Sequence, residues 1–61
     1  MHLLRRIERH LRATAMPPTK LGREAVRDPR FVFDLRRGRE PRAETERRVH
    51  AWLDAQEGAA R

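Results

Sequence analysis

The chain has 61 residues, which allow one domain with a small hydrophobic core, near the lower limit for folding without disulfides or a bound metal. Its 15 lysines and arginines outnumber 9 acidic residues, and the formal net charge of +6 favours nucleic acid or an acidic surface as partner. The sequence contains no cysteine, serine or tyrosine, so disulfides are excluded and most nucleophiles are missing. We therefore expect no enzymatic activity and no small-molecule substrate.

The arrangement of the remaining residues disfavours metal, cofactor and membrane proteins. His2, His10 and His50 lack the spacing of metal ligands, and no glycine-rich phosphate loop occurs, so we expect neither a metal nor a cofactor. No apolar run approaches the roughly 20 residues of a membrane span, and the first residues do not form a signal peptide. Arginine in place of lysine is typical of GC-rich genomes, but base composition does not explain the excess of basic over acidic residues.

The first predicted element is an amphipathic helix over residues 2–14. Leu3, Leu4, Ile7 and Leu11 recur at helical spacing, and four arginines and Glu8 occupy the other faces. A basic amphipathic helix could lie on a membrane surface or in the groove of a partner. With only four large apolar residues, the pattern favours one face of a helical bundle instead.

A second, short helix is predicted over residues 19–26. Pro17 and Pro18 end the first helix, and Thr19 can cap the second. Gly22 lies inside it, where glycine costs about 1 kcal/mol relative to alanine. This glycine either permits two helices to approach closely or is merely tolerated.

Asp28 and Pro29 mark the start of a third helix, predicted over residues 29–37. The Asp28 carboxylate can accept hydrogen bonds from free backbone N–H groups, and proline suits the first helical position. Gly38 is suited to end the helix in a left-handed conformation.

At about 100° per residue, the third helix separates into two faces. The apolar face, which we expect to be buried, contains Phe31, Val32 and Leu35. The opposite face carries Arg30, Phe33, Asp34 and Arg37. A short helix with arginines on its outer face is suited to bind something acidic.

A connector containing Pro41 precedes the last predicted helix, over residues 43–57. Val49, Trp52 and Leu53 provide its apolar face, and Gly58 is expected to end it. Trp52 is interpreted as part of the core, with a contact between two copies of the chain as the alternative. Four helices and no strand predict an all-α bundle, with a single domain over residues 1–58 and a frayed tail at 59–61.

Residues 21–39 resemble the helix-turn-helix of the Cro/phage-repressor (XRE-like) family of DNA-binding proteins. The family's small residue early in the first motif helix corresponds to Gly22. Its branched apolar residues in the second motif helix correspond to Val32 and Leu35, and an Arg-Gly-Arg run follows at residues 37–39. The chain departs from the family at the turn, where Val26 and Arg27 replace a glycine and an apolar residue.

The resemblance implies a small bacterial or phage transcriptional regulator with a lambda-repressor-like fold, cytoplasmic and associated with the nucleoid. It would bind double-stranded DNA through the major groove, and two copies on a two-fold operator would fit the family. The residues expected to read bases are Arg30, Phe33, Asp34 and Arg37. Those expected to hold phosphates are Thr19, Lys20, Arg27, Arg36 and Arg39.

Two other partners remain open from the sequence. The strip formed by Arg30, Phe33 and Arg37 could equally anchor an acidic protein, because an exposed phenylalanine flanked by arginines suits a protein interface. RNA is disfavoured, since the aromatic side chains that usually stack on single-stranded bases are missing. Asp34 could also form an ion pair with Arg30 or Arg37 and hold that arginine away from DNA.

Overall fold

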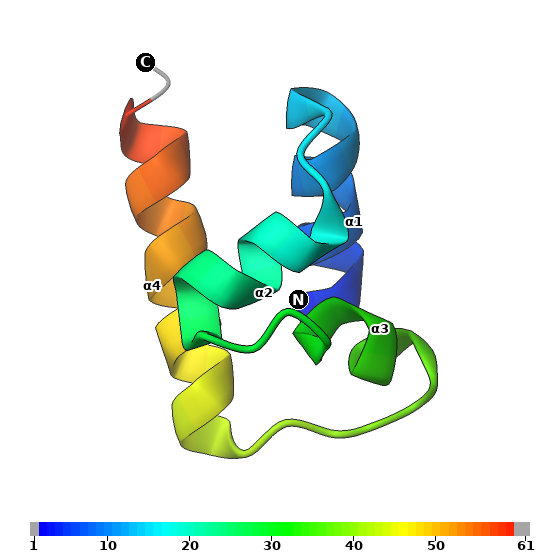
Figure 1. The fold of residues 1–61 in the computed structure, drawn as a ribbon. Helices are drawn as coiled ribbons and strands as arrows, with labels where there is room; N and C mark the ends of the chain where they lie inside the picture. The colour runs from blue at the N-terminus through cyan, green and yellow to red at the C-terminus, as the bar shows by residue number, and fades with distance from the viewer. Residues whose placement is uncertain (1, 60–61) are drawn as a thin grey trace.

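The computed structural model of the chain describes residues 2–59. Four helices follow one another: α1 (Leu3–Thr14), α2 (Pro18–Val26), α3 (Phe31–Arg36) and α4 (Ala43–Ala59). As Figure 1 shows, α1 and α4 stand on opposite sides, α2 crosses between them, and α3 lies below α2 near the start of α1. The described residues contain no strand, so the predicted all-α class is confirmed.

All four helices contribute apolar side chains to one core. Its ten buried members are Leu3, Ile7, Leu11, Leu21, Ala25, Phe31, Val32, Leu35, Val49 and Leu53. Phe31, Val32 and Leu35 of α3 are all among them, which confirms the predicted buried face. Trp52 is half-buried at the edge of this core, where its ring meets that of His10 edge-on, with centroids 5.6 Å apart.

The predicted cap of α2 is wrong by two residues. Pro17, and not Thr19, occupies the N-cap, and Pro18 is the first helical residue. Proline fits the first helical position because its fixed φ is already helical. The N–H that it lacks would have had no partner in the helix. The Pro17 carbonyl instead accepts the N–H of Lys20, at 3.0 Å.

The predicted end of α4 is also wrong, because the helix passes through Gly58 to Ala59. Glycine ends a helix when the chain turns into a left-handed conformation, and Gly58 does not have a positive φ. Ala59 therefore belongs to the helix, and the rest of the predicted tail lies outside the described residues.

Arg30 occupies the N-cap of α3 without a side-chain hydrogen bond, so the prediction of Asp28 at this position is wrong and the helix begins later than predicted. Asp28 instead forms a turn just before the helix. Its Oδ1 accepts the N–H of Arg30 at 3.0 Å, and its carbonyl accepts the N–H of Phe31 at 3.1 Å. These bonds form a turn at residues 29–30, so Pro29 precedes the helix and α3 starts at Phe31.

Gly38 ends α3 as predicted. It has a φ of +99°, and its N–H donates to the Leu35 carbonyl at 3.0 Å. The N–H of Arg39 donates to the Asp34 carbonyl, also at 3.0 Å. This pair of bonds satisfies the last carbonyls of the helix and directs the connector back toward α4.

The turn between α2 and α3 depends on two neighbouring backbone features. Arg27 adopts a left-handed conformation with a φ of 58°. It follows Val26, the residue that stands where the Cro/phage-repressor family usually has glycine. A Cβ built on Gly22 would collide with the Asp28 carbonyl oxygen and come within 3.3 Å of the Phe31 Cβ. Gly22 therefore permits the close approach of α2 to the start of α3.

Ala15, which ends α1, is a second non-glycine residue with a left-handed backbone, with a φ of 58°. Replacing Ala15 with glycine should raise the free energy of unfolding by about 0.5–1 kcal/mol, because glycine relieves the strain of the left-handed conformation. The matched control is Ala13→Gly in the same helix, which should lower that free energy by about 1 kcal/mol. Urea unfolding followed by circular dichroism measures both changes, and an equal loss in the two variants would contradict the assignment of strain.

A polar clamp joins α1 to α4 outside the core. The Arg6 guanidinium donates to His50 Nδ1 at 2.8 Å and to the carboxylates of Asp54 and Glu57. The hydrogen bonds to Asp54, chiefly, and to Glu57 raise the pKa of Arg6 above its usual range. Only 13% of the Arg6 side chain is exposed, because the partners on α4 cover it. The clamp therefore links α1 to α4 beside the core.

Candidate functional site

The outer face of α3 forms a hollow. Its lining consists of Arg30, Phe33, Asp34 and Arg37, the four residues predicted to read bases, and its volume is about 430 Å³. The helix buries its apolar face in the core, which leaves this face directed outward. Phe33 is 38% exposed and is the one large apolar side chain classed as exposed within the described part of the chain.

Asp34 forms an ion pair, but with neither of the arginines considered from the sequence. Its Oδ2 lies 3.0 Å from Nη1 of Arg39, which follows the helix and reaches back to it. Within residues 2–59, Arg30 and Arg37 form no ion pair. Their guanidinium groups therefore keep their hydrogen-bond donors for a ligand, while Asp34 holds Arg39 beside the hollow.

The residues predicted to hold phosphates are in different environments. Lys20 lies 3.9 Å from Glu24 on the same helix, a weak exposed pair that a phosphate could replace. Arg39 is paired with Asp34, whereas Arg27 is exposed and forms no ion pair among the described residues. Thr19 is partly buried at the start of α2, next to the two prolines.

Arg36, the remaining phosphate candidate, is bound to α1. Its Nε and Nη2 donate to the two carboxylate oxygens of Glu8, at 2.7 and 2.8 Å. Hydrogen bonding to Arg36 lowers the pKa of Glu8, and hydrogen bonding to Glu8 raises the pKa of Arg36. The Arg36 guanidinium carbon also lies 5.6 Å from the centroid of the Phe33 ring, within the range of a cation–π contact.

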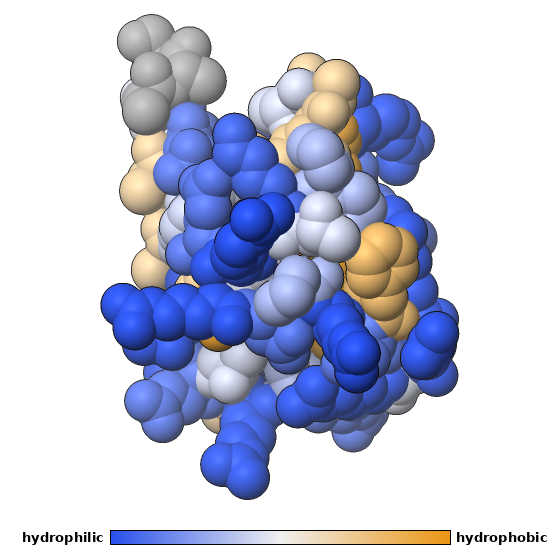
Figure 2. Space-filling view, in the orientation of Figure 1, coloured by the Kyte–Doolittle hydropathy of each residue, from blue (hydrophilic) through white to orange (hydrophobic). Residues whose placement is uncertain are grey.

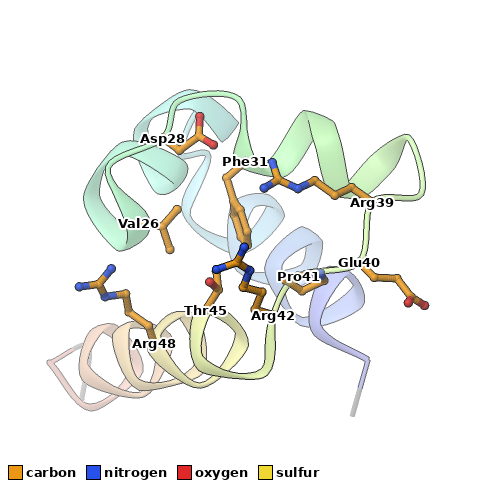
Figure 3. Close-up of a pocket in the computed structure, with 9 residues that line it drawn as sticks. All are labelled: Val26, Asp28, Phe31, Arg39, Glu40, Pro41, Arg42, Thr45 and Arg48. Carbon is orange, nitrogen blue, oxygen red and sulfur yellow. The ribbon is translucent and has the colours of Figure 1, made fainter.

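A second hollow, of about 350 Å³, lies between the α2–α3 turn, the connector and α4 (Figure 3). Arg39 and Arg42 extend toward Phe31 in this hollow, and Arg48 lies at its edge, while Glu40 points away. Arg42 and Arg48 were not predicted from the sequence, because nothing in their spacing relates a connector residue to one on α4. Both are exposed and form no ion pair within the described residues, so they can hold an anion.

The surface seen in Figure 2 is mainly hydrophilic, with only small hydrophobic areas. In the part of the chain that the structure describes, no helix is both long enough and apolar enough to cross a membrane. Residues 2–59 also contain no cluster of three or more histidine or acidic side chains that could hold a metal. Comparisons with protein-family models, curated proteins and solved structures gave no match for this chain.

Proposed function

We propose that the chain is a sequence-specific double-stranded DNA-binding domain of the helix-turn-helix type. In this proposal α2 and α3 form the motif, α3 enters the major groove, and the domain acts as a small bacterial or phage transcriptional regulator. The supporting observation is that α3 buries one apolar face in the core. Its opposite face presents an outward hollow lined by Arg30, Phe33, Asp34 and Arg37. Two copies on a two-fold operator would double the contact area and the specificity of a domain this small.

The chemistry of the hollow supports a preference for G·C pairs. Arg30 and Arg37 can each donate two hydrogen bonds to the O6 and N7 atoms of guanine. Asp34 can accept a hydrogen bond from the amino group of cytosine, and Phe33 can pack against a thymine methyl. Adenine is usually read by asparagine or glutamine, but the chain has no asparagine, and Gln56 lies on α4.

Phosphate contacts in this proposal come from both sides of α3. Arg27 lies before it, Arg39 after it, and Arg42 and Arg48 in the second hollow. Lys20 can add a contact at the start of α2 once its weak pair with Glu24 is replaced. Contacts of this kind fix the register of the protein on the duplex and contribute affinity without sequence preference.

Selection of binding sites from random duplexes tests the assignment of bases. The selected half-site should depend chiefly on G·C pairs, with at most one thymine contact. Arg37→Ala should reduce discrimination at one guanine by roughly 10- to 100-fold, the effect expected from one bidentate pair. Arg47→Ala is the matched control, because Arg47 is exposed on α4 and lines neither hollow. A core containing only A·T pairs, or an unaltered preference in Arg37→Ala, would contradict the proposal.

The second candidate function is a protein-interaction adaptor that binds an acidic partner. The observation in its favour is the exposure of Phe33 between Arg30 and Arg37, since aromatic and arginine side chains are enriched at the energetically important positions of protein interfaces. The two functions differ in their response to DNA, because an adaptor would show no sequence preference in the selection experiment.

A further inference from the structure

Glu8, Arg36 and Phe33 form a continuous chain of contacts, here called the Glu8 relay, that leads from α1 to the outer face of α3. Glu8 binds Arg36 through two hydrogen bonds, and the Arg36 guanidinium covers the Phe33 ring. The side chains of Glu8 and Arg36 are 33% and 39% exposed, so the relay lies at the surface beside the first hollow. None of its contacts belongs to the hydrophobic core.

The start of the relay is held rigidly. Ile7 is fully buried and Leu11 is 7% exposed, so the backbone of α1 on both sides of Glu8 is anchored in the core. A bidentate carboxylate fixes the plane of a guanidinium as well as its position. Arg36 is therefore oriented by a residue from another helix, 28 positions earlier in the chain.

The end of the relay is a side chain that would otherwise be mobile. An exposed phenylalanine that is surrounded by solvent can populate several rotamers, so its ring has no single fixed position. Arg36 lies over the ring, and 38% of Phe33 stays exposed and available to a ligand. The same arrangement uses two donors of Arg36, Nε and Nη2, within the protein.

We propose that Glu8 is a positioning residue for sequence recognition: through Arg36 it holds the Phe33 ring in the orientation that selects one base pair. This inference rests on the proposed DNA-binding function and assigns α1 a part in specificity although α1 does not enter the groove. It also replaces the predicted role of Arg36, which acts on Phe33 and does not hold a phosphate.

The test uses the full chain, with Phe33→Ala as the reference variant and uncharged glutamine substitutions at the paired residues. The base pair read by Phe33 is first identified as the one at which Phe33→Ala changes the selected sequence. Glu8→Gln should reduce discrimination at that pair by roughly two- to fivefold, as expected for an exposed cation–π contact, and leave the pairs read by Arg30 and Arg37 unchanged. Arg36→Gln should have the same effect, and the double variant should add nothing. Glu24→Gln, which removes the carboxylate that pairs with Lys20 on α2, should change no preference.

A second measurement does not depend on DNA. In the free protein, Glu8→Gln and Arg36→Gln should shift the same Phe33 ring signals in NMR spectra, with an unchanged circular dichroism spectrum. If the wild type fails to bind duplexes, the function is wrong, while the ring signals still report on the relay. Unchanged ring signals in Glu8→Gln would overturn the inference. It would also be overturned if Arg36→Gln kept its sequence preference while the double-logarithmic slope of affinity against salt concentration fell by about one, because Arg36 would then hold a phosphate.

Discussion

Gly22→Ala should lower the free energy of unfolding by about 1–3 kcal/mol, the usual range for inserting a group where there is no space. The added Cβ would collide with the carbonyl oxygen of Asp28, a backbone atom that also accepts the N–H of Phe31. The collision can be relieved only if α2 and the start of α3 move apart. In a domain this small, that loss is a large part of the total stability.

Gly58→Ala is the matched control, and its effect should have the opposite sign. Gly58 also lies in a helix, but a Cβ there would have no atom within 4 Å. Alanine should therefore raise the free energy of unfolding by up to about 1 kcal/mol through its helix propensity. Thermal and urea unfolding monitored by circular dichroism measure both variants. A Gly22→Ala protein as stable as the wild type would show that α2 and α3 are not in close contact at this point.

Raising the salt concentration from about 50 to about 200 mM should weaken duplex binding by roughly two orders of magnitude. Each phosphate neutralised by a cationic side chain releases counterions, with a slope near 0.9 in a double-logarithmic plot. Five phosphate contacts of the kind proposed above give a slope of about −4 for each subunit. Fluorescence anisotropy with a labelled duplex at several salt concentrations measures this slope.

Substitutions that each remove one positive charge then identify which side chains contribute to the salt dependence of binding. Arg42→Gln and Arg48→Gln should each reduce the slope by about one without a change in sequence preference. Arg47→Gln should leave the slope unchanged, because Arg47 lies on the same helix as Arg48 but outside both hollows. A complex that is insensitive to salt would favour the protein-interaction adaptor instead.

The features that were predicted correctly are those that local spacing determines. Phe31, Val32 and Leu35 were assigned to the buried face of α3 from the helical period alone, and all three are buried. The same period placed Arg30 and Arg37 on one outward face, where they line the first hollow. Helix ends were less accurate. Pro17 and Pro18 were predicted to end α1, but Ala15 ends it in a left-handed conformation, and the two prolines begin α2.

The features that were missed depend on contacts between distant parts of the chain. Nothing near Arg36 in the sequence indicates that Glu8 will accept its hydrogen bonds, since the pair forms only when α1 packs against α3. Asp34 has arginines at helical spacing on both sides, yet it pairs with Arg39, which lies beyond the end of the helix. The second hollow was missed for the same reason, because the connector had to fold back before Arg42 and Arg48 could face one cavity.

The position of α4 in the core has a consequence for how the domain forms during protein synthesis. Val49 and Leu53, two of the fully buried side chains, both come from this last helix. The partners that hold Arg6 at the surface, His50, Asp54 and Glu57, belong to it as well. A nascent chain whose first three helices have left the ribosome therefore still exposes part of their apolar faces. We therefore expect the core to close only after Val49 and Leu53 have emerged, because their contacts join distant parts of the chain.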